Sequence, residues 1–119
     1  MRNDSVKRTI PLLVYLILAL STSALAQDSN VVRVQGRVMS LDLYRNAVTV
    51  NEKVFVLDSK TTIKDEKDHP ISIDRLKPEA WVYVVGENNK TIKKLVAKKI
   101  YLLPKYIERK ERHLYPFMD

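Results

Sequence analysis

The region from Val31 to Leu103 alternates apolar and polar side chains with a period of two, the pattern of half-buried β-strands. In its first segment one face carries Val32, Val34, Gly36 and Val38, and the other carries Arg33, Gln35 and Arg37. Leu41 and Leu43 have the opposite parity, so we expect a β-bulge or bend within this long strand. Gly36, one of only two glycines in the chain, is its expected position.

Short polar breaks divide the following residues into further strands. Ala47–Val50 is rich in β-branched residues and predicts a second strand. Lys53–Leu57 predicts a third strand, and Thr61–Ile63 predicts a short continuation of it. The predicted connections are residues 44–46, 51–52 and 58–60.

The second half begins with a charged loop, residues 64–70. Ile71, Ile73 and Leu76 follow with the spacing of one helical turn, for which Ser72 or Asp74 is a candidate cap. Pro78 is expected to end that turn.

Two strands complete the pattern. Trp81–Gly86 is the most apolar strand, and Glu87–Lys90 is predicted to be the hairpin turn after it. The last strand, Thr91–Leu103, changes parity near Lys98, which predicts a second bulge there.

Three strands, a helical turn and two strands are the element order of a small OB-like Greek-key β-barrel. We therefore predict an all-β fold of five to six strands with one short helical turn, preceded by a signal-peptide helix. Closing the sheet would protect its edges, and a meander sandwich is the rival architecture.

Several motifs in this region resemble those of the DUF5666 family, which consists of small exported bacterial domains. The resemblance covers residues 31–103 and rests on the order and spacing of short strand and turn motifs. These are Gly36-Arg-Val38-Met-Ser40-Leu-Asp42, Val48-Thr-Val50-Asn51, Phe55-Val-Leu57-Asp58-Ser-Lys-Thr61-Thr-Ile63, and Leu76-Lys77-Pro78 running into Val82-Tyr-Val84-Val-Gly86. The resemblance implies an OB-like barrel and no known activity.

One position departs from the family pattern. The family usually has glycine after the Leu-Lys-x turn, where this chain has Glu79-Ala80. We therefore expect this turn to take a different backbone geometry.

The N-terminal residues 1–26 have the order of a secretory signal peptide. Basic residues precede an apolar run of 11 residues, Ile10–Leu20, and Ala24-Leu25-Ala26 predicts cleavage between Ala26 and Gln27. A membrane-spanning helix, the alternative, needs about 20 apolar residues. We therefore expect a periplasmic or secreted protein without a stable membrane anchor after cleavage. Residues 27–30 would be a short linker before the barrel.

Positive charge is concentrated near the C-terminus. Residues 27–86 carry nine basic and nine acidic side chains, whereas residues 87–119 carry nine basic and four acidic ones. The nine basic residues form a candidate anion-binding surface: Lys90, Lys93, Lys94, Lys98, Lys99, Lys105, Arg109, Lys110 and Arg112. The alternative is a solvated edge strand that resists aggregation.

Residues 104–119 form a basic and aromatic tail after the barrel. A short helix from Lys105 to Leu114 would be marginal in isolation, and Pro116 would stop it.

The residues that carry chemistry favour a non-enzymatic protein without cofactors. The chain has no Cys and only two His, His69 and His113, which lie in separate segments. Asp65, Glu66 and Asp68 could contact a divalent cation, but their loop lacks the glycine and spacing of an EF-hand, which favours a solvated loop. No phosphate loop, dinucleotide motif or nucleophile elbow occurs.

An OB barrel commonly binds ligands on strands two and three and the flanking loops. The candidate residues for single-stranded nucleic acid are Tyr44, Arg45, Lys53, Phe55 and Tyr83. Phe55 matches a core position of the family, Trp81 and Tyr83 are also candidates for the interior, and nucleic acid is an unusual ligand for an exported protein. We therefore expect an interaction or accessory module with a protein partner. The alternative is a binder of anionic polymer or membrane surface, such as a polysaccharide or lipid headgroup.

Overall fold

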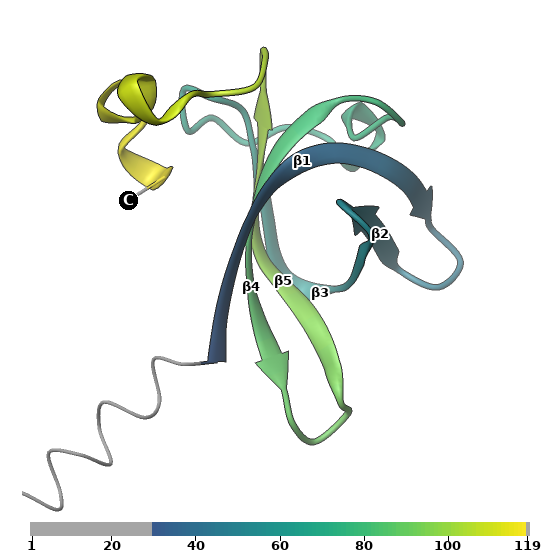
Figure 1. Cartoon of the computed structure of the whole chain (residues 1–119). Coiled ribbons are helices and arrows are strands. Elements are labelled where there is room, and N and C mark those ends of the chain that lie inside the picture. The colour runs from purple at the N-terminus through teal and green to yellow at the C-terminus, as the bar shows by residue number, and fades with distance from the viewer. Residues whose placement is uncertain (1–29, 119) are drawn as a thin grey trace, which may run out of the picture. The chain divides into compact units, whose positions relative to one another are not determined.

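The structure is a computed structural model and describes residues 30–118 (Figure 1). Five strands close into a barrel in the order β1-β2-β3-β5-β4. The strands are β1 (Val31–Asp42), β2 (Ala47–Val50), β3 (Lys53–Lys64), β4 (Trp81–Asn89) and β5 (Lys94–Leu103). Neighbouring strands are antiparallel except β3 and β5, which are parallel. The small all-β barrel predicted from the sequence is confirmed.

Strand β1 curves around the barrel because it changes partner along its length. Val31–Arg37 pairs with β4, and the segment from Val38 to Asp42 pairs with β2. The register shifts between Val38 and Ser40, which confirms the predicted bulge but places it at Met39. Gly36 instead lies where a Cβ would approach Asn51 Cβ to 3.1 Å and Val50 Cγ1 to 3.2 Å, so it permits close packing of β1 against the β2–β3 turn.

Strand β5 contains the second bulge at the predicted residue. Val85 pairs with Lys99 and Gly86 pairs with Ala97, which leaves Lys98 as the additional residue. The bulge brings both parities of the strand to the interior, because the apolar side chains before and after it contact the same core. These are Leu95, Ala97, Ile100 and Leu102.

The turn between β4 and β5 begins three residues later than the sequence predicts, so the predicted position is wrong. Strand β4 continues through Asn89, and the turn comprises residues 90–93. Three further pairs, from Glu87↔Val96 to Asn89↔Lys94, extend the hairpin. The Asn89 side chain then accepts hydrogen bonds from the backbone N–H groups of Thr91 and Ile92, so this asparagine starts the turn.

Strand β3 is continuous where the sequence predicts a break. The 58–60 segment stays in the strand, and the register with β5 shifts between Leu57 and Thr62. Asp58 accepts a hydrogen bond from the Lys60 N–H, and the Thr61 hydroxyl donates to the Ala97 carbonyl across the sheet. These contacts hold an irregular segment within a strand.

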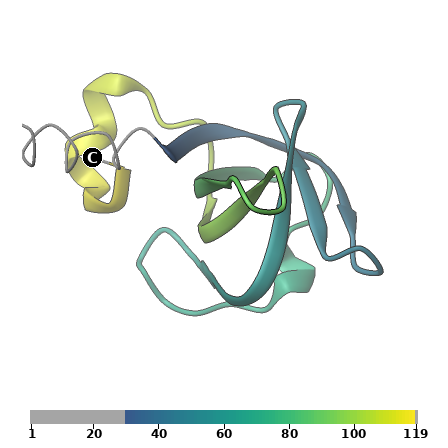
Figure 2. The ribbon, with the colours of Figure 1, turned by 90° about the horizontal axis from the view of Figure 1, so that it is seen from below.

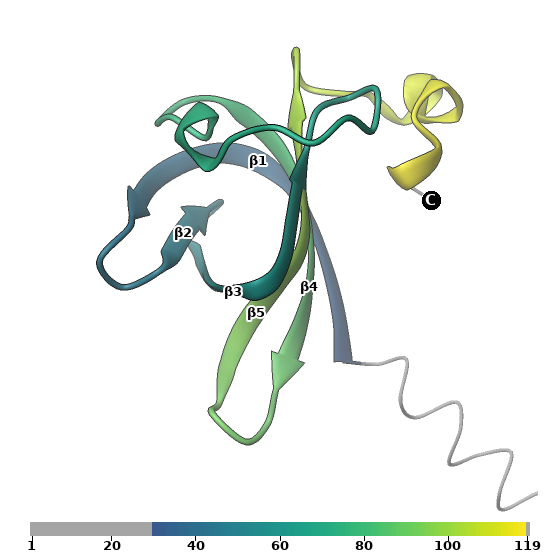
Figure 3. The same cartoon turned by 180° about the vertical axis from the view of Figure 1, so that it is seen from behind.

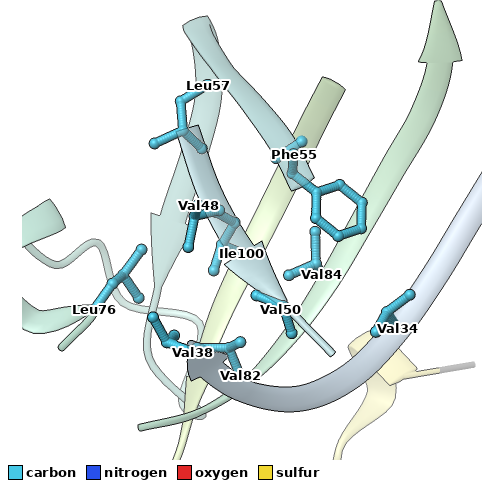
Figure 4. Close-up of a cluster of buried hydrophobic side chains, with 11 residues drawn as sticks. Val34, Val38, Val48, Val50, Phe55, Leu57, Leu76, Val82, Val84 and Ile100 are labelled. Atoms are coloured by element: carbon cyan, nitrogen blue, oxygen red, sulfur yellow. The ribbon is translucent and has the colours of Figure 1, made fainter. Parts of the chain in front are cut away.

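The barrel interior contains one aliphatic and aromatic core (Figure 4). Phe55, Val50, Val82 and Val84 have no exposed surface. Gly86 faces the Phe55 ring so closely that a Cβ would lie 2.8 Å from its Cε1 atom. The predicted core position of Phe55 is therefore confirmed.

The connection between β3 and β4 closes one end of this core. Its helical turn is η2 (Ile73–Arg75), and Leu76 behind it is fully buried. Ser72 precedes the turn as N-cap residue, although its side chain makes no capping hydrogen bond. Glu79 has a φ of 74°, which is the left-handed region that glycine favours. The turn therefore has a glycine-type backbone with glutamate in place of glycine, and the expectation of a different backbone geometry is wrong.

The tail, residues 104–118, lies beside the barrel (Figure 2). It contains two 3-10 helices, η3 (Arg109–Leu114) and η4 (Pro116–Met118), in place of the single helix from Lys105 to Leu114. Ile107 and Met118 are buried against the outer face of β4 and β5, in a second cluster with Tyr83, Tyr101 and Leu103. Tyr83 is thus covered by the tail and lies outside the barrel core.

The side-chain amide of Gln35 on β1 holds the tail through hydrogen bonds to the tail backbone. The Gln35 Nε2 donates to the Ile107 carbonyl at 3.0 Å, and the Ile107 N–H donates to Gln35 Oε1 at 2.6 Å. The amide therefore pairs with the extended tail as a neighbouring strand would.

The predicted signal peptide and its cleavage site at Ala26 and Gln27 lie outside the described residues. Within residues 30–118, no helix has the length and apolar character that crossing a membrane would require.

Candidate functional site

The structure divides the predicted anion-binding surface into two groups. Lys90, Lys93 and Lys94 lie at the β4–β5 turn, and the basic residues of the tail follow the opposite end of β5 (Figure 1). A strand of this length spans about 30 Å. Lys98 and Lys99 lie between the two groups. The nine basic residues therefore do not gather in one patch.

Tail cations are partly paired within the tail. Lys105 Nζ lies 2.9 Å from Glu111 Oε2, and Lys110 Nζ lies 3.6 Å from Glu108 Oε2. The hydrogen bond to Glu111 raises the pKa of Lys105, and the same contact lowers the pKa of Glu111. The positive charge that the sequence assigns to this segment is thus balanced in part by its own glutamates.

The lysines of the β4–β5 turn and of β5 make no ion pair with another described residue. They are Lys90, Lys93, Lys94, Lys98 and Lys99. Two of these, Lys93 and Lys94, line a groove on the outside of the barrel. That groove is the candidate site.

The β3–β5 groove has a volume of about 400 Å³. It is lined by Arg45, Ala47, Val54, Val56, Lys93, Lys94 and Leu95. These residues come from the β1–β2 loop, from β2 and β3, and from the β4–β5 turn with the start of β5. This is the position at which OB barrels commonly bind ligands.

The floor of the β3–β5 groove is aliphatic. Ala47 and Val56 are paired across β2 and β3, and Thr49 is paired with Val54 one step further along. Val54 is 55% exposed, although it is a large apolar residue within a strand. Leu95 reaches the groove from β5 and also packs against the barrel core.

The rim of the groove carries the positive charge. Asp42 Oδ1 accepts hydrogen bonds from the N–H groups of Tyr44 and Arg45, which fixes the β1–β2 loop. The Arg45 guanidinium lies 3.7 Å from the Asp42 carboxylate, and its side chain is 86% exposed. Lys93 has a φ of 57°, in the left-handed region, at the end of the opposite turn. Two loops thus present cations on either side of an apolar floor.

The sequence indicates the rim cations Arg45, Lys93 and Lys94 as candidate binding residues. It does not indicate the floor, because the alternating pattern assigns Val54 and Val56 only to a strand. A signal was present, since Val54-Phe55-Val56-Leu57 is apolar on both faces of one strand. A strand with one face in the core and the other apolar has a surface available for a partner.

The candidate aromatic residues do not form a stacking platform. Phe55 is buried in the core, and Tyr83 is covered by the tail, whereas Tyr44 is fully exposed on its loop. Lys53 is also exposed, at the start of β3. Trp81 is covered by the Arg37 guanidinium 4.8 Å from the ring centroid and by the edge of Tyr106. The structure therefore does not bring these aromatic residues together.

The acidic loop uses its carboxylates for its own conformation. Asp65 Oδ1 accepts the N–H groups of Lys67 and His69, and Asp68 pairs with Lys64 at 3.2 Å. The hydrogen bond from His69, with a second from Lys67, lowers the pKa of Asp65. No group of three potential metal-ligating side chains occurs among residues 30–118. His69 lies within 3.9 Å of Asp65, and His113 lies apart from it in η3.

A second cavity of about 530 Å³ lies between this loop and the tail, which approach each other in Figures 1 and 3. Phe117 stacks on Tyr101 with ring centroids 4.0 Å apart. Burial, with the nearby Asp68 carboxylate, raises the pKa of Tyr101. The cavity walls carry Glu66, Lys67 and Asp68 beside the rings of Tyr101 and Phe117, and Asp68 is already paired with Lys64.

Comparison with known proteins finds a likeness among the solved structures. No protein-family model and no curated protein matches the chain. Among solved structures, the chain is similar to the fimbrial biogenesis protein PilY2 from Pseudomonas aeruginosa PAO1. The TM-score is 0.47 at 19% sequence identity, and the match covers 60% of this chain and 86% of that one.

Proposed function

We propose that this chain is an exported, non-enzymatic binding module of the DUF5666 type that holds a partner protein in the β3–β5 groove. The observation that carries the proposal is the groove itself, in which two loops place three cations around an aliphatic floor. The module would bind without a cofactor and would work in the periplasm or outside the cell.

The exposure of Val54 supports this proposal. A large apolar side chain on the outside of a strand loses contact with water only when something covers it, and that burial is favourable. Leu43 and Tyr44 on the β1–β2 loop and Ile92 on the β4–β5 turn are likewise exposed apolar residues. The loops on both sides of the groove therefore offer further apolar contacts.

Site-specific crosslinking in an envelope extract tests the proposal. A photo-crosslinking residue at position 54 should give a discrete adduct with a partner protein. The Lys93→Glu/Lys94→Glu variant should reduce that adduct, because it reverses the charge at the rim. The same crosslinker at position 60, on an exposed part of β3 away from the groove, is the control. Equal adducts from both positions would show that the groove is not the binding site.

A second function, binding to an anionic polymer or membrane surface, is favoured by the unpaired lysines. Lys90, Lys98 and Lys99 make no ion pair within the described chain and lie outside the β3–β5 groove lining. Cations without an ion-pair partner attract polyanions, and salt weakens this attraction.

Retention on an immobilised polyanion tests this second function. Charge reversal of Lys90, Lys98 and Lys99 should lower the salt concentration that elutes the protein. Charge reversal of Lys105 and Lys110, which are paired with glutamates, should lower it less. Unchanged elution after reversal of the first set would rule the second function out.

A further inference from the structure

We propose that the ligand of the β3–β5 groove is an acidic, aliphatic peptide segment of the partner. A Leu, Ile or Val side chain of that segment would lie on the groove floor, and neighbouring Asp or Glu residues would pair with the rim cations. This inference rests on the binding-module function proposed above and specifies the ligand of the same site.

The floor selects against ligands that bind through flat rings. Nucleobases stack on aromatic side chains, and successive stacking contacts supply much of their affinity. The four floor residues, Ala47, Val54, Val56 and Leu95, are all aliphatic. Branched aliphatic side chains present an uneven surface, which packs well against another branched aliphatic side chain. The floor therefore matches the side chain of Leu, Ile or Val.

The rim selects for more than one negative charge. Lys93 and Lys94 have no ion-pair partner within residues 30–118, and both border the groove. Arg45 pairs with Asp42 at 3.7 Å, but both side chains are well exposed, and exposed pairs contribute little. Arg45 therefore stays available to a second carboxylate. An apolar floor beside these cations also strengthens their attraction for an anion, because it lowers the local dielectric constant.

A peptide combines the two requirements in a short length. Adjacent residues in an extended segment place an aliphatic side chain and a carboxylate within a few ångströms of each other. The cations lie on two loops on either side of the floor, so carboxylates before and after the aliphatic residue would each meet one. A polyanion would satisfy the rim and leave the floor uncovered.

A pair of matched peptides tests this chemistry. The ¹⁵N-labelled protein would be titrated with the capped peptide Asp-Leu-Glu-Ile-Asp and with its control Asp-Ser-Glu-Ser-Asp, which has the same charge. The first should shift the amide resonances of Ala47, Val54, Val56 and Leu95. The second should bind at least about tenfold more weakly, because it buries no aliphatic surface.

Variants separate the floor from the rim. Val54→Ser and Lys93→Glu/Lys94→Glu should each weaken the aliphatic peptide about tenfold, whereas Lys60→Glu/Lys77→Glu, with the same change in net charge, should not. Val54→Thr keeps the β-branched shape and serves as the floor variant if Val54→Ser does not fold.

Two results would overturn the inference. Equal affinity for the two peptides would mean that charge alone is recognised, as in the polyanion function. Absence of any shift at millimolar peptide would exclude this peptide chemistry. In either case a discrete adduct from position 54, lost in the Lys93→Glu/Lys94→Glu variant, would still support the binding module.

Discussion

Glu79 adopts a backbone conformation that suits glycine better than glutamate. Its φ of 74° forces the Cβ toward neighbouring backbone atoms, although its N–H makes a 2.7 Å hydrogen bond to the Val38 carbonyl. Relief of this strain in Glu79→Gly should therefore raise the free energy of unfolding by about 1 kcal/mol. The greater conformational entropy that glycine gives the unfolded chain offsets part of this gain. Glu79→Ala should give no such gain, because alanine keeps the Cβ. Denaturant unfolding of both variants measures the difference, and an equal effect of the two would show that φ is not the cause.

Asp58 makes stability depend on pH at the acidic end. The hydrogen bond from the Lys60 N–H, with help from Thr61 and from Lys98, lowers the pKa of Asp58 below its usual 3.8. A carboxylate with a depressed folded-state pKa stabilises the protein above its unfolded-state pKa, and this contribution is lost as pH falls through the folded-state pKa. The melting temperature should therefore fall below about pH 4, and Asp58→Asn should reduce that fall.

Asp74→Asn is the matched control for this pH dependence. Asp74 is an exposed residue of η2, so its replacement controls for the loss of one surface carboxylate. Identical slopes in the wild type and Asp58→Asn would contradict the assignment to Asp58.

At the scale of elements, the Gln35 side chain of β1 attaches the tail by pairing with the Ile107 backbone. Gln35→Leu would leave the Ile107 N–H and carbonyl without their partners, at a cost of about 1–3 kcal/mol for each buried group. The tail should then open more often, and trypsin should cut after Arg109 or Lys110 faster while the barrel stays intact. Gln35→Glu keeps the acceptor for the Ile107 N–H and should have an intermediate effect. Equal cleavage rates in all three proteins would show that this amide does not hold the tail.

At the scale of the whole molecule, residues 30–118 form two apolar clusters, which lie on opposite faces of β4 and β5. The barrel core contains Phe55 and its neighbours, and the second cluster forms only where the tail covers β4 and β5. Because the clusters share no buried side chain, the barrel should fold without the tail.

Removal of residues 104–119 should therefore leave a folded barrel of lower stability. The loss of Ile107 burial alone would cost about 1.5–3 kcal/mol. Uncovered Tyr83, Tyr101 and Leu103 should increase binding of a hydrophobic dye, and Leu114→Ser, at a residue already 64% exposed, should not. Loss of the β-sheet circular dichroism spectrum in the truncated protein would show that the barrel requires its tail.

The strand pattern of this protein was readable in the sequence because side-chain alternation is a local property. The parity change near Lys98 predicted a bulge that the structure confirms. The resemblance of the motifs around Phe55 to those of a known family implied its core position, which the structure also confirms. The turn before β5 was misplaced because Asn occurs at positions 88 and 89, and only cross-strand pairing decides which of them ends the strand.

The division between sequence and tertiary structure follows the range of the interactions. The positions of the charged residues in the sequence determined where the positive charge lies along the chain. The alternation of apolar and polar side chains determined the order of the strands. Only the fold decided that the tail pairs its cations with its own glutamates and covers Tyr83, and that Val54 and Val56 meet Arg45 and Lys93 in one groove. The groove and the cover over Tyr83 join residues far apart in sequence, which only the folded chain brings together, whereas the tail ion pairs join near neighbours.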